Sequence, residues 1–259
     1  MTLPKFTRAL MRRPAPTFAD GLTTNSHLGT PDPDLTKSQY ESYLTALRAC
    51  GLDVTLLPPD EQFPDGHFVE DPVVIFRDMA FIARPGAKPR ENEGAILVEH
   101  LIHLNRVYTE STEAHLEGGD VLFCTDRVLI GLGERTNRAG AEQLSSALRG
   151  VQSDLKVDFV PFGNVIHLKT GLTEIAPGVL VHNPRMTMDF DPGFSEVINL
   201  PPEQGYAANT LPINDTLLLI EGYPDVVEIA EKHYANIITL NMSEFEKMDG
   251  SLTCLSLRY

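Results

Sequence analysis

Cysteine is scarce in this sequence and never occurs in the patterns that form disulfide frameworks or zinc sites. Cys50, Cys124 and Cys254 are odd in number and widely spaced, with no CxxC pair and no His/Cys cluster at zinc spacing. The sequence therefore implies neither a disulfide framework nor a structural zinc site.

Long apolar runs are also missing. Runs such as Thr216–Ile220 fall far short of the roughly 18 residues of a membrane span, and Met1 to Arg13 contains no secretory apolar segment. There is no low-complexity tract, and 42% of the residues are hydrophobic. These features predict an ordinary soluble globular protein, and we expect it in the cytoplasm.

Basic residues are outnumbered, with 21 Lys and Arg against 36 Asp and Glu and a formal charge of −15. Nucleic acids and anionic membranes bind clustered Lys and Arg, so neither is an expected partner. An acidic surface attracts cations instead, although solubility alone accounts for the acidity equally well.

What the sequence does contain is a repeated pattern of a polar residue, a strand, a tight turn and a second strand, which predicts β-hairpins. The hairpins are expected at 70–83, 120–132, 167–182 and 209–220, with turns at 77–78, 125–126, 176–178 and 214–215. Each hairpin is followed by a helix and then by a further strand. The helices are expected at 91–104, 136–148, 184–189 (a degenerate helix) and 224–233, and the strands that follow them at 106–108, 156–162, 196–200 and 236–240.

The two chain ends supply the remaining unit. A helix is predicted at 34–49, ended by Gly51, followed by a strand at 53–57. Pairing of a terminal strand at 252–259 with residues 5–10 would complete this unit and close a ring without a free edge.

Marker residues recur at similar intervals in these units. Glu70, Glu117, His167, Asn209 and Cys254 follow one another at 47, 50, 42 and 45 positions, within the roughly 20–50 residues typical of modular repeats. Five units around an axis would bring one marker from each to a common centre. The alternative is an ordinary α+β domain with accidental spacing.

The markers include the groups needed for covalent attack on a cationic carbon. Gly250 and Ser251 before Cys254 predict a thiol on an exposed turn, suited to a nucleophile. His167 can act as general acid and base with Glu117 as its partner, and Glu70-Asp71 can accept hydrogen bonds from a guanidinium. Taken singly, each has a simpler interpretation: a buried Cys, a hydrogen-bonded core His, a solvated strand start or a turn.

Several phrases of the sequence resemble those of dimethylarginine dimethylaminohydrolases, members of the guanidine-modifying pentein superfamily, almost from end to end. They are Asp20-Gly21-Leu22-Thr23, 56–61 (LLPPDE), 68–72 (FVEDP), Thr136-Asn137, 167–172 (HLKTGL), 206–209 (YAAN) and 249–258 (DGSLTCLSLR). The resemblance implies a single α/β-propeller catalytic domain over residues 1–259, built from five pseudo-symmetric ββαβ units. It also implies hydrolysis of methylated arginine, a small cationic substrate, to citrulline without a cofactor.

The same resemblance assigns roles to individual residues. It makes Cys254 the nucleophile, His167 the general acid and base, and Glu117 the carboxylate partner of His167. The residues that it places around the substrate are Leu22 on a lid loop, Asp65, Phe68, Glu70 and Asp71 near the guanidinium, Arg90 and Arg135 at the α-carboxylate, and Met248 near the α-amino group.

Other functions stay open at this point. An arginine deiminase or an amidinotransferase would share the chemistry, a non-enzymatic pentein that binds ribosomal subunits would share only the fold, and a zinc protein would use Cys254 and His167 as ligands. No metal is expected, since no further ligands are spaced for a closed site. A homodimer is compatible with the sequence, which does not reveal the oligomeric state.

Overall fold

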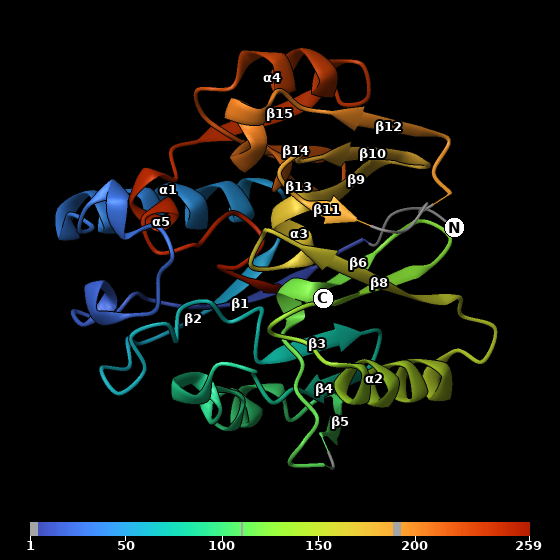
Figure 1. Ribbon diagram of the computed structural model, residues 1–259. Coiled ribbons are helices and arrows are strands. Elements are labelled where there is room, and N and C mark those ends of the chain that lie inside the picture. Colours follow the sequence, from blue (N-terminus) through green and yellow to red (C-terminus); the bar gives the residue numbers. More distant parts are fainter. Residues whose placement is uncertain (1–4, 110, 189–192) are drawn as a thin grey trace.

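The computed structural model describes residues 5–109, 111–188 and 193–259, which form an α/β fold with five separate sheets (Figure 1). Each sheet combines an antiparallel strand pair with a parallel neighbour. The sheets consist of β1 (Arg8–Arg12), β2 (Asp53–Leu57) and β16 (Leu257–Arg258); β3 (Val73–Phe76), β4 (Met79–Ile82) and β5 (Asn105–Tyr108); β6 (Val121–Phe123), β7 (Val128–Leu132), β8 (Val157–Gly163) and β11 (Thr187–Met188); β9 (Leu172–Ala176), β10 (Val179–His182) and β12 (Glu196–Asn199); and β13 (Leu211–Ile213), β14 (Thr216–Ile220) and β15 (Asn236–Leu240).

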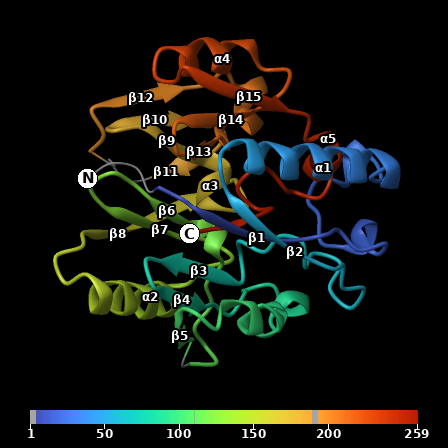
Figure 2. The same ribbon diagram turned by 180° about the vertical axis from the view of Figure 1, so that it is seen from behind.

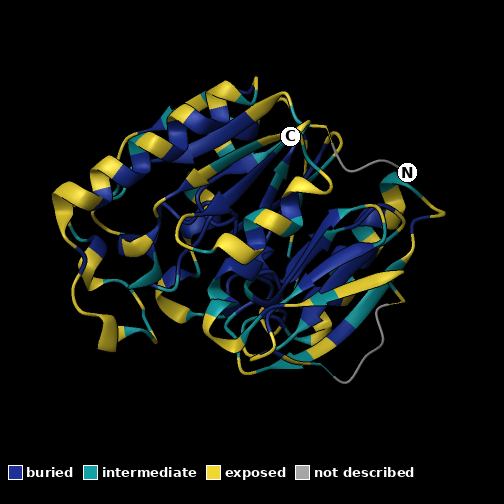
Figure 3. Cartoon of the chain, turned by 90° about the horizontal axis from the view of Figure 1, so that it is seen from above, coloured by how far each residue is buried: buried dark blue, intermediate teal, exposed yellow. Residues whose placement is uncertain are grey.

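Helices cover the outside of the sheets. The longer ones, α1 (Pro33–Ala49), α2 (Arg138–Val151) and α4 (Pro224–Glu231), lie at the periphery in both views (Figures 1 and 2), whereas α3 (Leu168–Gly171) and α5 (Ser243–Glu246) are single turns. Their outer faces are exposed and the strands beneath them are largely buried (Figure 3). None of the helices among the described residues has the length and apolar character needed to cross a membrane.

The sequence explains how α1 and the first hairpin form. Asp32 caps α1 by accepting hydrogen bonds from the backbone N–H groups of Asp34 and Leu35, both at 2.9 Å, and Pro33 occupies the first turn. Between β3 and β4 the two-residue turn begins at Arg77, whose φ of 54° lies in the left-handed region used by tight hairpin turns.

All four predicted hairpins are confirmed by strand pairing, as are the helix–strand pairs at 34–57, 136–162 and 224–240. Pairing of the chain ends is confirmed over a shorter stretch, because β16 pairs antiparallel with β1 only at Leu257 and Arg258. Residues 252–255 form turns instead of the expected strand.

Three local predictions were wrong. The strand expected from His167 begins only at Leu172, since residues 168–171 form α3. The region expected to be a helix at 91–104 instead forms short 3-10 segments at Glu93–Ile96 and Val98–Leu101, and a further one precedes them at Lys88–Arg90. Arg90 and Glu93 are turned inward and buried, so tertiary contacts override helix propensity here. At 184–188 a turn leads into β11, and Asp189, the last residue of that expected helix, lies outside the described residues.

Candidate active site

A small recess gathers residues that are far apart in the sequence. Ten of the eleven predicted site residues line it: Leu22, Asp65, Phe68, Asp71, Arg90, Glu117, Arg135, His167, Met248 and Cys254. Ile166, Asp249 and Gly250 line it too, although the sequence did not assign them to the site. The eleventh, Glu70, lies elsewhere.

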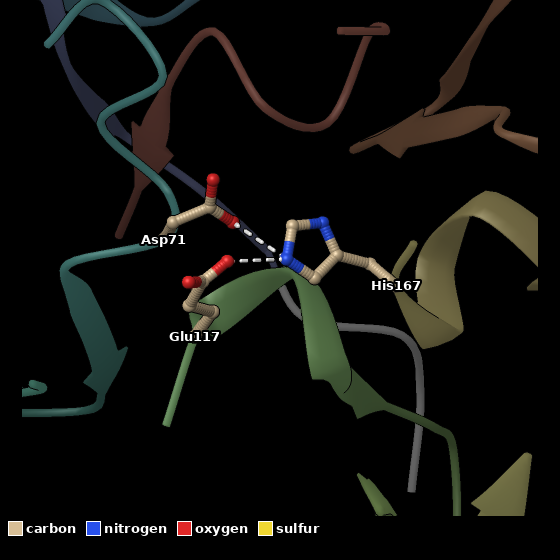
Figure 4. Close-up of side chains that lie close together, drawn as sticks. All are labelled: Asp71, Glu117 and His167. Atoms are coloured by element: carbon tan, nitrogen blue, oxygen red, sulfur yellow. Dashed lines mark hydrogen bonds and ion pairs between the residues drawn. The ribbon is translucent and has the colours of Figure 1, made fainter. Parts of the chain in front are cut away.

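The side chains of His167, Asp71 and Glu117, which line this recess, point toward one another (Figure 4). The imidazole Nε2 is 2.6 Å from Glu117 Oε2 and 3.9 Å from Asp71 Oδ1. All three side chains are buried, and one potential ligand atom from each lies within 4.8 Å of the others. A cation entering here, whether a metal ion or an organic ion, would meet two carboxylates and an imidazole.

The Gly118-Gly119 pair explains how the elements approach so closely. A Cβ atom on Gly119 would lie 2.6 Å from His167 Cγ and 2.9 Å from Asp71 Oδ1, so only glycine fits between them. The N–H of Gly119 donates to Asp71 Oδ1 at 3.1 Å, and the N–H of Glu117 donates to Thr136 Oγ1 at 3.0 Å. The turn after Glu117 therefore holds both carboxylates in place.

The protonation of this cluster follows from its charges. Burial alone would lower the pKa of His167, but Asp71, the hydrogen bond to Glu117 and Asp120 together raise it to about 9. Burial opposes ionisation of Glu117, yet the hydrogen bond to His167 and the charge of His167 hold its pKa below the usual value. At neutral pH the pair is an imidazolium and a carboxylate.

Cys254 lies on a turn, as predicted, but this turn is not exposed. The residue is only 8% exposed, because the turn is packed between α1 and the sheets. Tyr43 of α1 donates to the carbonyl of Leu252 at 2.7 Å, and Asn209 pairs twice with Thr253, at 3.0 and 3.1 Å. The thiol therefore faces the recess from a fixed backbone.

The protein environment of Cys254 favours the protonated thiol. Burial raises its pKa to about 12, and the negative charges of Asp71 and Glu70 add to this effect. A bound cation would reverse the electrostatic part of this shift, because an opposite charge nearby favours the thiolate.

Asp65 and Asp249 connect the recess to the loop that carries Leu22. The N–H of Leu22 donates to Asp65 Oδ2 at 3.1 Å, while Asp65 Oδ1 is buried and has no hydrogen-bond partner among the described residues. Asp249 accepts from the N–H and the hydroxyl of Thr24 at 2.6 and 2.8 Å. The free oxygen of Asp65 is an acceptor for a donor-rich ligand.

The two arginines differ in their availability. Arg90 is 5% exposed, and its guanidinium binds Asp71 and Glu93 at 2.7 Å each. Arg135 approaches Glu117 Oε1 only at 3.6 Å. Arg135 is thus the freer donor for a carboxylate. Glu93 belongs to none of the sequence motifs, and only its position three residues after Arg90 indicates an ion pair between the two side chains.

Glu70 does not line the recess. Its Oε1 accepts from Lys169 Nζ at 2.7 Å and from Arg258 at 2.6 Å, and it lines a different cavity together with both. Glu70 and Asp71 lie in the turn before β3, and their side chains diverge there to different partners. Glu70 is therefore paired with Lys169 and Arg258, and its expected contact with a substrate guanidinium stays a prediction.

Comparison with known proteins gives the family. The arginine deiminase family model matches residues 96–191. An N(G),N(G)-dimethylarginine dimethylaminohydrolase of Pseudomonas aeruginosa is 38% identical over 98% of this chain and 100% of its own length, and one of Streptomyces coelicolor is 36% identical over 97% and 96%. The solved structure of a cysteine-to-serine variant of the Pseudomonas aeruginosa protein, complexed with citrulline, superimposes with a TM-score of 0.90 at 36% identity, covering 99% of this chain and 100% of the other.

The fold and the site thus define a guanidine-modifying pentein. Structures of the N-terminal domain of a cyanobacterial arginine dihydrolase share the fold at 18% identity and a TM-score of 0.81, covering 97% of both chains. Because the full-length relatives are above 30% identity, the assignment is narrower: the chain belongs to the dimethylarginine dimethylaminohydrolase family.

Proposed function

We propose that this protein hydrolyses asymmetric dimethylarginine and monomethylarginine to citrulline, releasing dimethylamine or methylamine. The observation that carries the proposal is that Cys254, the His167–Glu117 pair and the carboxylates of Asp65 and Asp71 line one recess. A guanidinium carbon is a poor electrophile, so its hydrolysis needs a strong nucleophile, a proton donor and anions that hold the cation.

The first half of the reaction forms a covalent intermediate. Asp65 and Asp71 accept hydrogen bonds from the substrate guanidinium, whose charge favours loss of the Cys254 proton to solvent. The thiolate attacks the guanidinium carbon and forms a C–S bond. The C–N bond to the methylated nitrogen then breaks, and the amine leaves with a proton from the His167 imidazolium.

The second half returns the enzyme to its starting state. Neutral His167, held by Glu117, removes a proton from water, and the resulting hydroxide attacks the carbon of the cationic thiouronium. The C–S bond breaks, the added hydroxyl passes its proton to the departing sulfur, and citrulline is released with Cys254 restored as a thiol. We assign Arg135 to the α-carboxylate of the substrate, Met248 to its α-amino end and Leu22 to the lid, because all three line the recess.

We further propose that residues 1–259 form one catalytic domain in which the five sheets are blades of a pseudo-fivefold propeller. Two observations support this: each sheet combines an antiparallel pair with a parallel strand, and the five marker residues are all buried. Pairing of β1 with β16 then joins the chain ends.

The test is incubation with arginine, monomethylarginine and dimethylarginine in parallel, with citrulline and the released amine both measured. Citrulline with dimethylamine or methylamine supports the proposal. Citrulline and ammonia from unmethylated arginine would instead indicate an arginine deiminase, the second candidate, because that family's model covers the segment with Glu117 and His167. The variant Cys254→Ser is expected to stay folded and to form no citrulline.

A further inference from the structure

The guanidinium of Arg90 contacts Asp71, which is the same carboxylate that is proposed to bind the guanidinium of the substrate. Its NH1 donates to Asp71 Oδ2 at 2.7 Å, and its guanidinium carbon lies 6.0 Å from the centre of the Phe68 ring. The side chain lines the recess and is 5% exposed. Arg90 thus makes the contact expected of a ligand of the same chemical class.

Asp71 already carries the charge of Arg90. Its Oδ1 accepts from the N–H of Gly119 at 3.1 Å and lies 3.9 Å from His167 Nε2, while Oδ2 accepts from Arg90. These two hydrogen bonds occupy about half of the lone-pair directions of the carboxylate, so a second guanidinium would share Asp71 with Arg90 against the repulsion of like charges, or displace it.

The other nitrogens of Arg90 have a separate anchor. The Nε–H faces both carboxylate oxygens of Glu93 at 3.0 and 3.1 Å, and NH2 donates to Glu93 Oε2 at 2.7 Å and to the carbonyl of Phe68 at 3.2 Å. Glu93 is 2% exposed. Arg90 can therefore give up Asp71 while its charge stays compensated by the fork with Glu93.

We propose that Arg90 is an internal competitor for the substrate guanidinium at Asp71, and that Glu93 is the positioning residue that retains Arg90 when the substrate enters. This inference rests on the substrate class of the proposed function. It assigns to Arg90 a role in setting affinity for guanidinium ions, in addition to any contact with the α-carboxylate.

The two residues should then have opposite effects on binding. Neutralising Glu93 alone leaves Asp71 as the main counter-charge of Arg90, so Arg90 holds Asp71 more strongly and an external guanidinium binds less tightly. Neutralising both Arg90 and Glu93 removes the competitor and leaves Asp71 unpaired, so an external guanidinium binds more tightly. A purely structural role of the pair would weaken binding in both variants.

The experiment measures the dissociation constant of methylguanidinium by calorimetry in a Cys254→Ala background, where no turnover occurs. We expect Glu93→Gln to weaken binding by about tenfold and Arg90→Gln/Glu93→Gln to tighten it by about tenfold, each the effect of roughly one hydrogen bond to a charged group. Glu91→Gln is the matched control, since Glu91 lies in the same segment but pairs with Arg84. It should leave binding unchanged.

Effects of the same sign in the two variants, or no effect of Glu93→Gln, would overturn the inference, and so would absence of methylguanidinium binding in the reference protein. If the double variant does not fold, the single variant Arg90→Gln takes its place, because it also removes the competitor and should tighten binding where a purely structural role would weaken it. Because binding is read without turnover, a protein that binds methylguanidinium as expected but forms no citrulline from methylarginines would contradict the proposed function alone.

Discussion

Among single residues, His167 gives the site its pH dependence. Its pKa of about 9 in the folded protein is above the unfolded value of 6.5, so the stability from its protonated form is complete below pH 6.5 and is lost as the pH rises through 9. Glu117 has a lowered pKa, so its contribution is present above 4.5 and is lost as the pH falls through its folded value. The ion pair therefore stabilises the fold fully between about pH 4.5 and 6.5.

The first prediction concerns Glu117→Gln. Without the carboxylate at 2.6 Å, the pKa of His167 should fall by roughly 1–3 units, the usual effect of a close opposite charge. The alkaline limb of the kcat/KM profile for dimethylarginine, expected near pH 9 in the parent protein, should then move to lower pH. A profile that loses amplitude but keeps its alkaline limb would contradict the assigned pairing.

The second prediction concerns Asp71→Asn, which should separate binding from thiol reactivity. KM for dimethylarginine should rise about 10- to 100-fold, because a charge-assisted hydrogen bond is lost. Alkylation of Cys254 by iodoacetamide in the substrate-free protein should become faster, since the charge of Asp71 contributes to the raised thiol pKa. Slower alkylation together with the higher KM would indicate a collapsed recess instead.

The residues of the site are easier to predict from the sequence than the residues that each of them contacts. Sequence reasoning placed Cys254, His167, Glu117 and Asp71 in one site, and these four line the same recess. It put Glu70 beside Asp71 because they are adjacent in the chain, although their side chains diverge to different partners. The contact of the buried Arg90 with Asp71, which lies 19 positions earlier, depends on the folded structure and cannot be predicted from the spacing of the two residues.

At the scale of secondary-structure elements, the start of α2 supports the loop before Glu117. The side chain of Asn137 accepts from the N–H groups of Gly140 and His115 at 2.9 and 3.2 Å and donates to the carbonyl of Glu113 at 2.7 Å. We predict that Asn137→Ala lowers the free energy of unfolding by about 1–2 kcal/mol, as for other N-cap losses.

Urea unfolding followed by circular dichroism measures this difference. The control is Asn236→Ala, because Asn236 is exposed and makes one long hydrogen bond of 3.4 Å, so its loss should change stability by less than about 0.5 kcal/mol. Equal losses in the two variants would mean that Asn137 does not act as a cap.

The fourth prediction addresses the loop that carries Leu22 and Thr24. Asp249 holds this loop and has a φ of 57°, a conformation that glycine adopts without strain. Asp249→Gly should therefore release Thr24 while keeping the backbone, with faster amide hydrogen exchange at Thr24 and a KM for dimethylarginine raised by about tenfold. Unchanged exchange at Thr24 would show that other contacts suffice to hold the loop.

Elements with strong local signals were predicted well, and those set by burial were not. The hairpins have alternating or apolar strands with polar turns, so local sequence specifies them. Residues 168–171 look like the start of a strand but form α3, where the N–H of Leu168 donates to Asp120 at 2.9 Å. This contact with a residue 48 positions away cannot be read from a local pattern.

Across the whole molecule, contacts distant in sequence join the chain end to the site. Arg258 of β16 donates to the carbonyls of Ser256 and Thr253 at 2.6 and 3.0 Å and to Glu70 at 2.6 Å. The strand that pairs with β1 is thereby tied to the turn carrying Cys254 and to the residues before β3. The marker spacing predicted that such segments converge, but not that an arginine beyond the markers links them.

The last prediction is that Arg258→Met weakens both the fold and the reaction. Loss of one partner of a buried ion pair costs about 3 kcal/mol, although Lys169 still compensates the charge of Glu70. Urea unfolding should show this loss, and kcat per folded molecule should fall because Thr253 and Ser256, on either side of Cys254, lose three hydrogen bonds from Arg258. Lys232→Met, at an exposed position directly after α4, should change neither quantity. Lower stability with unchanged kcat would show that Asn209 and Tyr43 alone position the thiol and that closure of the chain ends serves the fold only.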